Sequence, residues 1–101
     1  MLNDVKDASV VITNPTHLAI ALRFDRNQDN APVVLAKGSD LLAKKIIAIA
    51  KENNVPVIER KPVARALYGI VDVGDEIPLD LYHAVAEILA YVSRNQSIIR
   101  R

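Results

Sequence analysis

Two strand-like stretches near the start of the chain flank a short polar segment. Residues 9–13 form an apolar run, which predicts a buried strand. Residues 17–24 alternate between apolar and other positions, which predicts a strand with one face in the core, formed by Leu18, Ile20, Leu22 and Phe24. Pro15 stands between the two stretches, and because proline cannot donate to a sheet ladder, we expect a break or turn there.

The middle of the chain predicts a loop, a strand and a helix in succession. Polar residues 25–30 predict the loop, and residues 33–36 predict a third strand that ends at Gly38. The helix begins with Ser39 as its N-cap and Asp40 at the positive end of its dipole. Its expected apolar face consists of Leu41, Leu42, Ile46, Ile47 and Ile49.

The last part of the chain predicts one more strand and two helices. Residues 57–58 form the strand, and residues 62–68 a short helix that Gly69 ends. Pro78 opens the last helix, because its fixed φ and missing N–H suit the first helical turn. The core stripe expected on this helix is Leu81, Val85, Ile88 and Val92.

The order β-β-β-α-β-α-α predicts the fold class. We expect an α/β fold, a single-domain sandwich with a mixed four-stranded β-sheet surrounded by about three to four helices. The strand, helix and strand around residues 33–58 favour a parallel pair. The length of 101 residues suits one domain rather than two.

Composition argues against several function classes. Thirteen Lys and Arg against twelve Asp and Glu give a net charge of +1, and the Lys and Arg are spread along the chain. The sequence therefore gives no electrostatic case for binding nucleic acid, which needs a basic face. Two histidines without any cysteine make a metal site improbable on composition, and we expect no metal and no small-molecule cofactor. Neither a phosphate loop nor a nucleophile elbow is present, which disfavours an ordinary turnover enzyme.

The segment Asn14-Pro15-Thr16-His17 carries distinctive chemistry. The usual rearrangement of asparagine needs the next backbone N–H, which Pro15 lacks. The Asn14 carboxamide nitrogen can instead attack its own backbone carbonyl carbon and expel Pro15 as a new amino terminus. His17 is a candidate proton acceptor, and Thr16 a candidate to orient the turn or to bind the oxyanion.

An Asn-Pro dipeptide is more often an ordinary turn, and a lone histidine is more often structural than catalytic. Chemistry alone therefore leaves two hypotheses open for residues 14–17. Either the chain cuts itself between Asn14 and Pro15, or the segment is an inert turn in a binding module.

The segment NPTH, with five longer stretches, resembles the FlhB/YscU family of the bacterial flagellar and type III secretion export apparatus. The stretches occur in the family's order: TNPTHLAIAL, APVVLAKG, KENNVPVIER, PVARALYG and IPLDLYHAVAEILAYV. The resemblance covers about residues 4–95, and the second and last stretches favour the flagellar branch.

The resemblance implies that the chain cleaves itself once between Asn14 and Pro15, as a single-turnover reaction, and that both pieces stay associated. Cleavage would permit the switch from early rod- and hook-type to late filament-type export substrates. Implied partners are the protein's own transmembrane domain, other export-gate proteins, early substrates and the hook-length control protein. The implied location is the cytoplasmic side of the bacterial inner membrane.

The resemblance also suggests a division of the chain. We expect residues 1–8 to be a linker from a membrane domain, residues 9–95 the self-cleaving export-switch domain, and residues 96–101 a tail. A stand-alone soluble paralogue, or an injectisome homologue acting as a substrate-binding module, is the alternative.

A second apolar stripe, Tyr82, Ala86 and Leu89, runs beside the core stripe of the last helix. It either widens the core contact or forms an exposed patch for a partner. In the family, such a patch receives early export substrates, and the matching positions here are Ala31, Pro32, Ala86 and Leu89.

Overall fold

The strand-like segments pair into one four-stranded sheet in the order β3-β2-β1-β4. β1 (Val10–Asn14) runs antiparallel to β2 (Leu18–Arg23), and β2 runs antiparallel to β3 (Val33–Ser39). β4 (Val57–Glu59) lies on the other side of β1 and runs parallel to it. The sheet is therefore mixed, as predicted, and the two strands that flank the predicted turn are its central strands.

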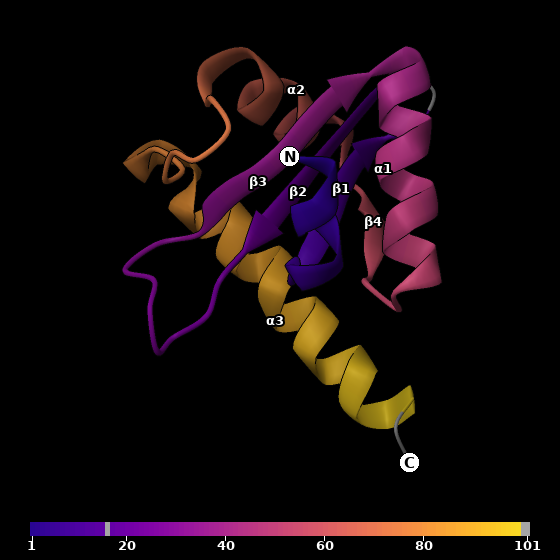
Figure 1. Cartoon of the computed structure of the whole chain (residues 1–101). Coiled ribbons are helices and arrows are strands. Elements are labelled where there is room, and N and C mark those ends of the chain that lie inside the picture. The colour runs from indigo at the N-terminus through magenta and orange to yellow at the C-terminus, as the bar shows by residue number, and fades with distance from the viewer. Residues whose placement is uncertain (16, 100–101) are drawn as a thin grey trace.

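Helices cover both faces of the sheet (Figure 1). The computed structural model describes residues 1–15 and 17–99, with side chains as far as Asn95 in the last helix. α1 (Asp40–Glu52) packs on one face, and α2 (Lys61–Ile70) and α3 (Tyr82–Ile99) pack on the other. Two short 3₁₀ helices, η1 (Leu2–Asp7) and η2 (Leu79–Leu81), complete the described elements.

The sheet divides the core into two clusters of buried side chains. Alternate residues of β1 and β2 point to opposite faces, so that Ile12 and Ile20 face α2 and α3, whereas Val11 faces α1. The α3 stripe packs as predicted, because Val85, Ile88 and Val92 are all buried in the first cluster. The apolar run at the start of β1 is therefore buried on both sides, which is typical of a central strand.

Four local predictions were wrong in detail. The second face of β2 is also buried, because Ala19 and Ala21 are small enough to lie directly under α1. On α1, Leu41 is exposed rather than part of the core face. β3 continues through Gly38 to Ser39, and α2 continues past Gly69 to Ile70.

Two further differences concern the chain's route. The strands around α1 are not neighbours, because β4 pairs with β1 at the opposite edge of the sheet from β3. Residues 2–7, which lie within the expected linker, form η1, and Val5 in this helix is fully buried against α1 and β3. At the other end, η2 precedes α3, and the α3 backbone extends to Ile99. Whether residues 1–8 continue into a membrane domain stays a prediction.

Gly38 allows α1 to approach β3, and this contact generates a prediction. A Cβ atom at this position would lie 2.5 Å from the Leu42 Cγ and 2.9 Å from its Cβ. We expect Gly38→Ala to lower the free energy of unfolding by about 1–3 kcal/mol, because the helix has to shift. The control is Gly69→Ala, where no atom lies within 4 Å of the added methyl group. It should raise stability by up to about 1 kcal/mol, and equal urea midpoints for both variants would contradict the contact.

The loop between β2 and β3 is held by one partly buried ion pair. Arg23 Nε and Nη2 donate to both Asp29 carboxylate oxygens, at 3.0 and 2.8 Å, and the Asp25 N–H donates to Oδ2 at 2.8 Å. The Asp29 side chain is only 4% exposed. The Arg23 guanidinium, with the help of the Asp25 N–H, holds the pKa of Asp29 below its ordinary value of 3.8.

The lowered pKa of Asp29 predicts an acid-sensitive contribution to stability. This contribution is present above pH 3.8, the ordinary pKa, and is lost as the pH falls through the lower pKa of the folded state. We therefore expect Asp29→Asn to lower the free energy of unfolding at pH 7. Below pH 3.8, this free energy should decrease less steeply with falling pH in the variant than in the unmodified chain, as measured by urea unfolding. Asp7→Asn, at an exposed carboxylate, controls for the loss of charge alone. Parallel pH curves for the Asp29 variant and the unmodified chain would contradict the assignment.

Candidate functional site

The predicted turn connects the two central strands, and one hydrogen bond closes it. Asn14 ends β1 and stands opposite Leu18, the first residue of β2. The backbone N–H of His17 donates to the backbone carbonyl oxygen of Asn14 at 2.9 Å. Because the carbonyl carbon of Asn14 belongs to the Asn14–Pro15 peptide bond, this hydrogen bond polarises the bond that the sequence predicts to be cut.

The two residues on either side of that bond lie in different environments. Asn14 is only 5% exposed, and Thr13 before it is 3% exposed. Pro15 and His17 are exposed to solvent. The carboxamide of Asn14 therefore belongs to the protein interior, whereas the proline that would leave belongs to the surface. Thr16, the fourth residue of the predicted motif, lies outside the described residues.

Two further backbone hydrogen bonds hold the peptide groups around the turn. The Arg60 N–H, just after β4, donates to the Thr13 carbonyl oxygen at 3.0 Å. The Asp40 N–H, at the start of α1, donates to the His17 carbonyl oxygen at 2.9 Å. The turn is therefore fixed from β4 on one side and from α1 on the other, and its geometry does not depend on its own residues alone.

The imidazole of His17, which the sequence predicts to accept a proton, lies beside the Asp40 carboxylate. Its Nδ1 lies 4.0 Å from Asp40 Oδ1, and both side chains are largely exposed. A neutral imidazole can accept a proton at one nitrogen while the other points to a carboxylate. The arrangement thus combines a polarised carbonyl, an adjacent carboxamide and a base within one short segment.

The described residues offer neither a metal site nor a membrane-spanning helix. Residues 1–15 and 17–99 contain no group of three or more His, Asp or Glu side chains arranged to hold a metal ion. None of the described helices has the length and apolar character needed to cross a bilayer.

The predicted substrate patch is spread over two elements. Ala31 and Pro32 lie just before β3, where Ala31 is 2% exposed and the Pro32 carbonyl oxygen accepts a hydrogen bond from the Ile77 N–H at 2.9 Å. On α3, Ala86 is exposed, whereas Leu89 is half-buried and packs against the core. The second stripe of α3 therefore both widens the core, through Leu89, and reaches solvent, through Ala86.

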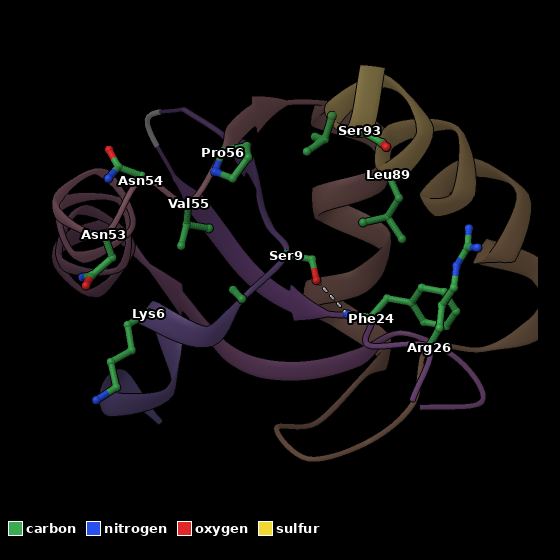
Figure 2. Close-up of a pocket in the computed structure, with 12 residues that line it drawn as sticks. Lys6, Ser9, Phe24, Arg26, Asn53, Asn54, Val55, Pro56, Leu89 and Ser93 are labelled. Carbon is green, nitrogen blue, oxygen red and sulfur yellow. Dashed lines mark hydrogen bonds between the residues drawn. The ribbon is translucent and has the colours of Figure 1, made fainter. Parts of the chain in front are cut away.

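Leu89 also lines a cavity of about 460 Å³. Figure 2 shows Leu89 from α3 and Phe24 from the end of β2 on the same side of this cavity, with Ser9 nearby. The Ser9 hydroxyl accepts a hydrogen bond from the Phe24 N–H at 2.9 Å. The loop between β2 and β3 and the α3 helix therefore meet at this cavity, beside the predicted patch.

The sequence analysis missed two residues that hold the turn, Asp40 and Arg60. Asp40 was interpreted only as a partner of the helix dipole, and Arg60 received no role in the turn. Both act through backbone N–H groups, which every residue except proline possesses, so side-chain pattern carries no signal for them. The one available signal for Asp40 is its type, because Asp and Asn tolerate a left-handed backbone.

Comparisons with known proteins agree with one another. The family described as "FlhB HrpN YscU SpaS Family" matches residues 1–92. The flagellar biosynthetic protein FlhB of Aquifex aeolicus is 53% identical over 92 residues, which cover 91% of this chain and 26% of that protein. The chain thus spans about a quarter of the length of the curated relatives it matches.

Solved structures give the same result for the fold. The crystal structure of the cytoplasmic domain of FlhB from Shewanella putrefaciens is similar with a TM-score of 0.94 and 36% identity, covering 98% of this chain and 76% of that one. A mutated EscU C-terminal domain is similar with a TM-score of 0.86 and 34% identity, covering 90% of this chain and 97% of that one. The family match and the fold agree with each other, and the chain belongs to the FlhB/YscU family, with flagellar proteins among its relatives.

Proposed function

We propose that this chain is an export-switch domain that cleaves its own backbone once, between Asn14 and Pro15. The observation that carries the proposal is the 2.9 Å hydrogen bond from the His17 N–H to the carbonyl oxygen of Asn14. It polarises that carbonyl in a turn where proline forbids the commoner asparagine rearrangement. Three solved structures of the EscU C-terminal domain carry asparagine-to-aspartate, asparagine-to-alanine and proline-to-alanine substitutions, which lends support.

In the first step, the Asn14 carboxamide nitrogen attacks the backbone carbonyl carbon of the same residue. A carbon–nitrogen bond forms and closes a five-membered ring, and the carbonyl electron pair moves to the oxygen. One proton of the carboxamide passes to the His17 imidazole. The His17 N–H stabilises the developing oxyanion, since a backbone donor already aimed at that oxygen needs no reorganisation.

In the second step, the oxygen electron pair returns and the bond to the Pro15 nitrogen breaks. The protonated imidazole of His17 gives its proton to that nitrogen, which leaves as a secondary amine. The products are a succinimide at the end of the first piece and Pro15 as the first residue of the second. Water later opens the succinimide, and because Asn14 is consumed, the reaction occurs once per chain.

The structure supports association of the two pieces after the cut. Val5, Val10, Val11 and Ile12 of the first piece are all fully buried. Their transfer from water contributes on the order of 1.5–3 kcal/mol for each side chain. Backbone hydrogen bonds add to this, including Ser9 N–H to the Leu22 oxygen at 2.7 Å and Val11 N–H to the Pro56 oxygen at 2.8 Å.

The first prediction from this mechanism concerns the intact mass of the purified protein. We expect two chains, residues 1–14 and 15–101, under denaturing conditions and a single particle in native size measurement.

Two variants test the roles of individual residues in the cut. Asn14→Ala should give one uncut chain with the same helix content, because only the nucleophile is lost. His17→Ala should slow cleavage roughly 100-fold or more, the usual contribution of a general base.

Two outcomes would contradict the assignment. A single intact chain in the unmodified protein, after prolonged incubation at neutral pH, would refute self-cleavage. A cut that persists in Asn14→Ala would show that another group breaks the bond.

We also propose a role in export that follows from the relatives. The curated relatives are named flagellar biosynthetic proteins, and a structural relative is titled a cytoplasmic domain. On that basis the domain works on the cytoplasmic side of the bacterial inner membrane, joined to its own transmembrane domain. There it contacts other export-gate proteins and the hook-length control protein, and its cleavage permits the change from early to late substrates.

For the early substrates, we propose the apolar patch of Ala31, Pro32, Ala86 and Leu89 as the docking surface. The exposed Ala86 and the half-buried Leu89 continue the core of α3 outward toward solvent. Pro32 is half-buried, whereas Ala31 is only 2% exposed, so that Ala31 supports the patch and contact with a substrate falls to the other three residues. The loop that carries Ala31 and Pro32 is held in place by the partly buried Arg23–Asp29 pair.

Ala86 offers the cleaner test of this patch, because Leu89 also supports the core. We expect Ala86→Asp to reduce binding of a purified rod- or hook-type substrate at least about tenfold, since a charge would face an apolar ligand, while the melting temperature stays unchanged. Glu87→Ala, at an exposed neighbour on the same helix, is the control. Wild-type affinity in Ala86→Asp would refute this docking surface.

A further inference from the structure

Asp40 has an unusual backbone conformation for its position. Its φ is +51°, and among the described residues only Asp40 and Asn54 adopt a positive φ without being glycine. For Asn54 the local structure provides a reason, because a left-handed residue commonly follows the end of a helix and α1 ends at Glu52. Asp40 stands at the opposite end of α1, where helices begin without such a residue.

Capping of the helix does not account for this conformation. Ser39 occupies the N-cap position, but its side chain makes no capping hydrogen bond. Left-handed backbone costs on the order of 1–2 kcal/mol in a residue with a Cβ, although Asp and Asn tolerate it best. Strain of this kind persists where the surrounding structure requires it, and such residues cluster at functional sites.

The conformation of Asp40 coincides with two contacts to the same residue of the turn. Its backbone N–H donates to the His17 carbonyl oxygen at 2.9 Å. Its carboxylate Oδ1 lies 4.0 Å from the His17 Nδ1. The carboxylate is 79% exposed and the imidazole 66%, so this pair adds little to stability. The exposed Asp40–His17 pair therefore acts on the orientation of the His17 side chain rather than on the stability of the fold.

We propose that Asp40 is a positioning residue for the cleavage of the Asn14–Pro15 bond; the inference rests on the proposed self-cleavage. Its N–H fixes the backbone of His17, whose own N–H polarises the Asn14 carbonyl. Its carboxylate favours the imidazole tautomer with the proton on Nδ1, which leaves Nε2 free to accept the carboxamide proton. As His17 becomes positively charged in the transition state, the 4.0 Å separation can shorten and the attraction grows.

Three variants separate these contributions. Asp40→Gly retains the N–H and accepts a positive φ, so it removes only the carboxylate. Asp40→Asn retains the left-handed tolerance and the shape of the side chain but removes the charge. Asp40→Ala removes the carboxylate and also penalises the backbone conformation. Because purified chain would already be cut, cleavage has to be followed from synthesis, by denaturing electrophoresis of a cell-free translation over time.

We expect Asp40→Gly and Asp40→Asn to slow cleavage about tenfold, a part of the usual contribution of a general base. Cleavage of the Asp40→Ala variant should be slower still, because its backbone is strained as well. Asn54→Ala is the matched control, because it strains the other left-handed residue, just past the opposite end of α1, and should lower stability without changing the cleavage rate. A wild-type rate in Asp40→Gly, or equal slowing in Asn54→Ala, would overturn the inference.

A spectroscopic measurement distinguishes positioning from a general loss of structure. In the uncleavable Asn14→Ala chain, ¹⁵N chemical shifts of His17 report which ring nitrogen carries the proton. Adding Asp40→Gly should reduce the population with the proton on Nδ1, and an unchanged population would refute the role of the carboxylate. An uncut unmodified chain would instead overturn the proposed function, and this inference with it.

Discussion

The hydrogen bond between the His17 N–H and the Asn14 carbonyl oxygen, at 2.9 Å, closes the turn between β1 and β2. The same bond draws electron density from the carbonyl carbon that the proposed reaction attacks. A turn of this kind is otherwise unremarkable, and its chemical consequence arises from the residues around it. Asparagine supplies an attacking nitrogen one residue-length away, and proline removes the competing backbone N–H. The hydrogen bond that closes the hairpin is therefore also the one that would activate its backbone in the proposed cleavage.

The position of the turn in the sheet explains how the chain can be cut and remain folded. β1 and β2 are the central strands, so each has a second neighbour besides the other. β1 pairs with β4, and β2 pairs with β3, so neither strand depends on the turn for its place. Cutting an edge hairpin would free a strand that is held on one side only. Cutting between central strands leaves both cores and both ladders in place.

Much of this arrangement could be predicted from the sequence, because it depends on side-chain pattern. The alternation in 17–24 and the stripe Val85, Ile88 and Val92 identified real buried faces. The burial of Ala19 under α1 was missed, because alanine occurs on either face of a strand without changing the apolar period. The pairing of β4 with β1 was missed for a related reason, since apolar pattern indicates the buried faces of a strand but not its neighbours in the sheet.

The residues of the candidate site likewise fall into those that the sequence could predict and those that it could not. Asn14, Pro15 and His17 could be named from the sequence, because the chemistry needs those residue types side by side. Asp40 and Arg60 could not, since they fix the turn through backbone N–H groups that come from β4 and α1, more than 20 residues away along the chain. Tertiary structure alone brings such donors to the turn.

The location of the docking patch constrains how a cut at the turn could affect it. β2 connects the two regions, because its first residue, Leu18, follows the turn and its last, Arg23, holds Asp29 in the loop before Ala31. β2 is also held on both sides by strand pairing and on both faces by buried side chains, so it cannot slide without loss of the core. A signal carried by movement of β2 is therefore costly.

In the proposed function, the change that cleavage makes at low cost is local. It consists of a new positively charged amine at Pro15, a new chain end at Asn14 and a turn that is no longer closed by a continuous chain. Partners that distinguish the cut from the uncut domain have those features to recognise, at the end of the sheet where Asp40 and Arg60 anchor the turn.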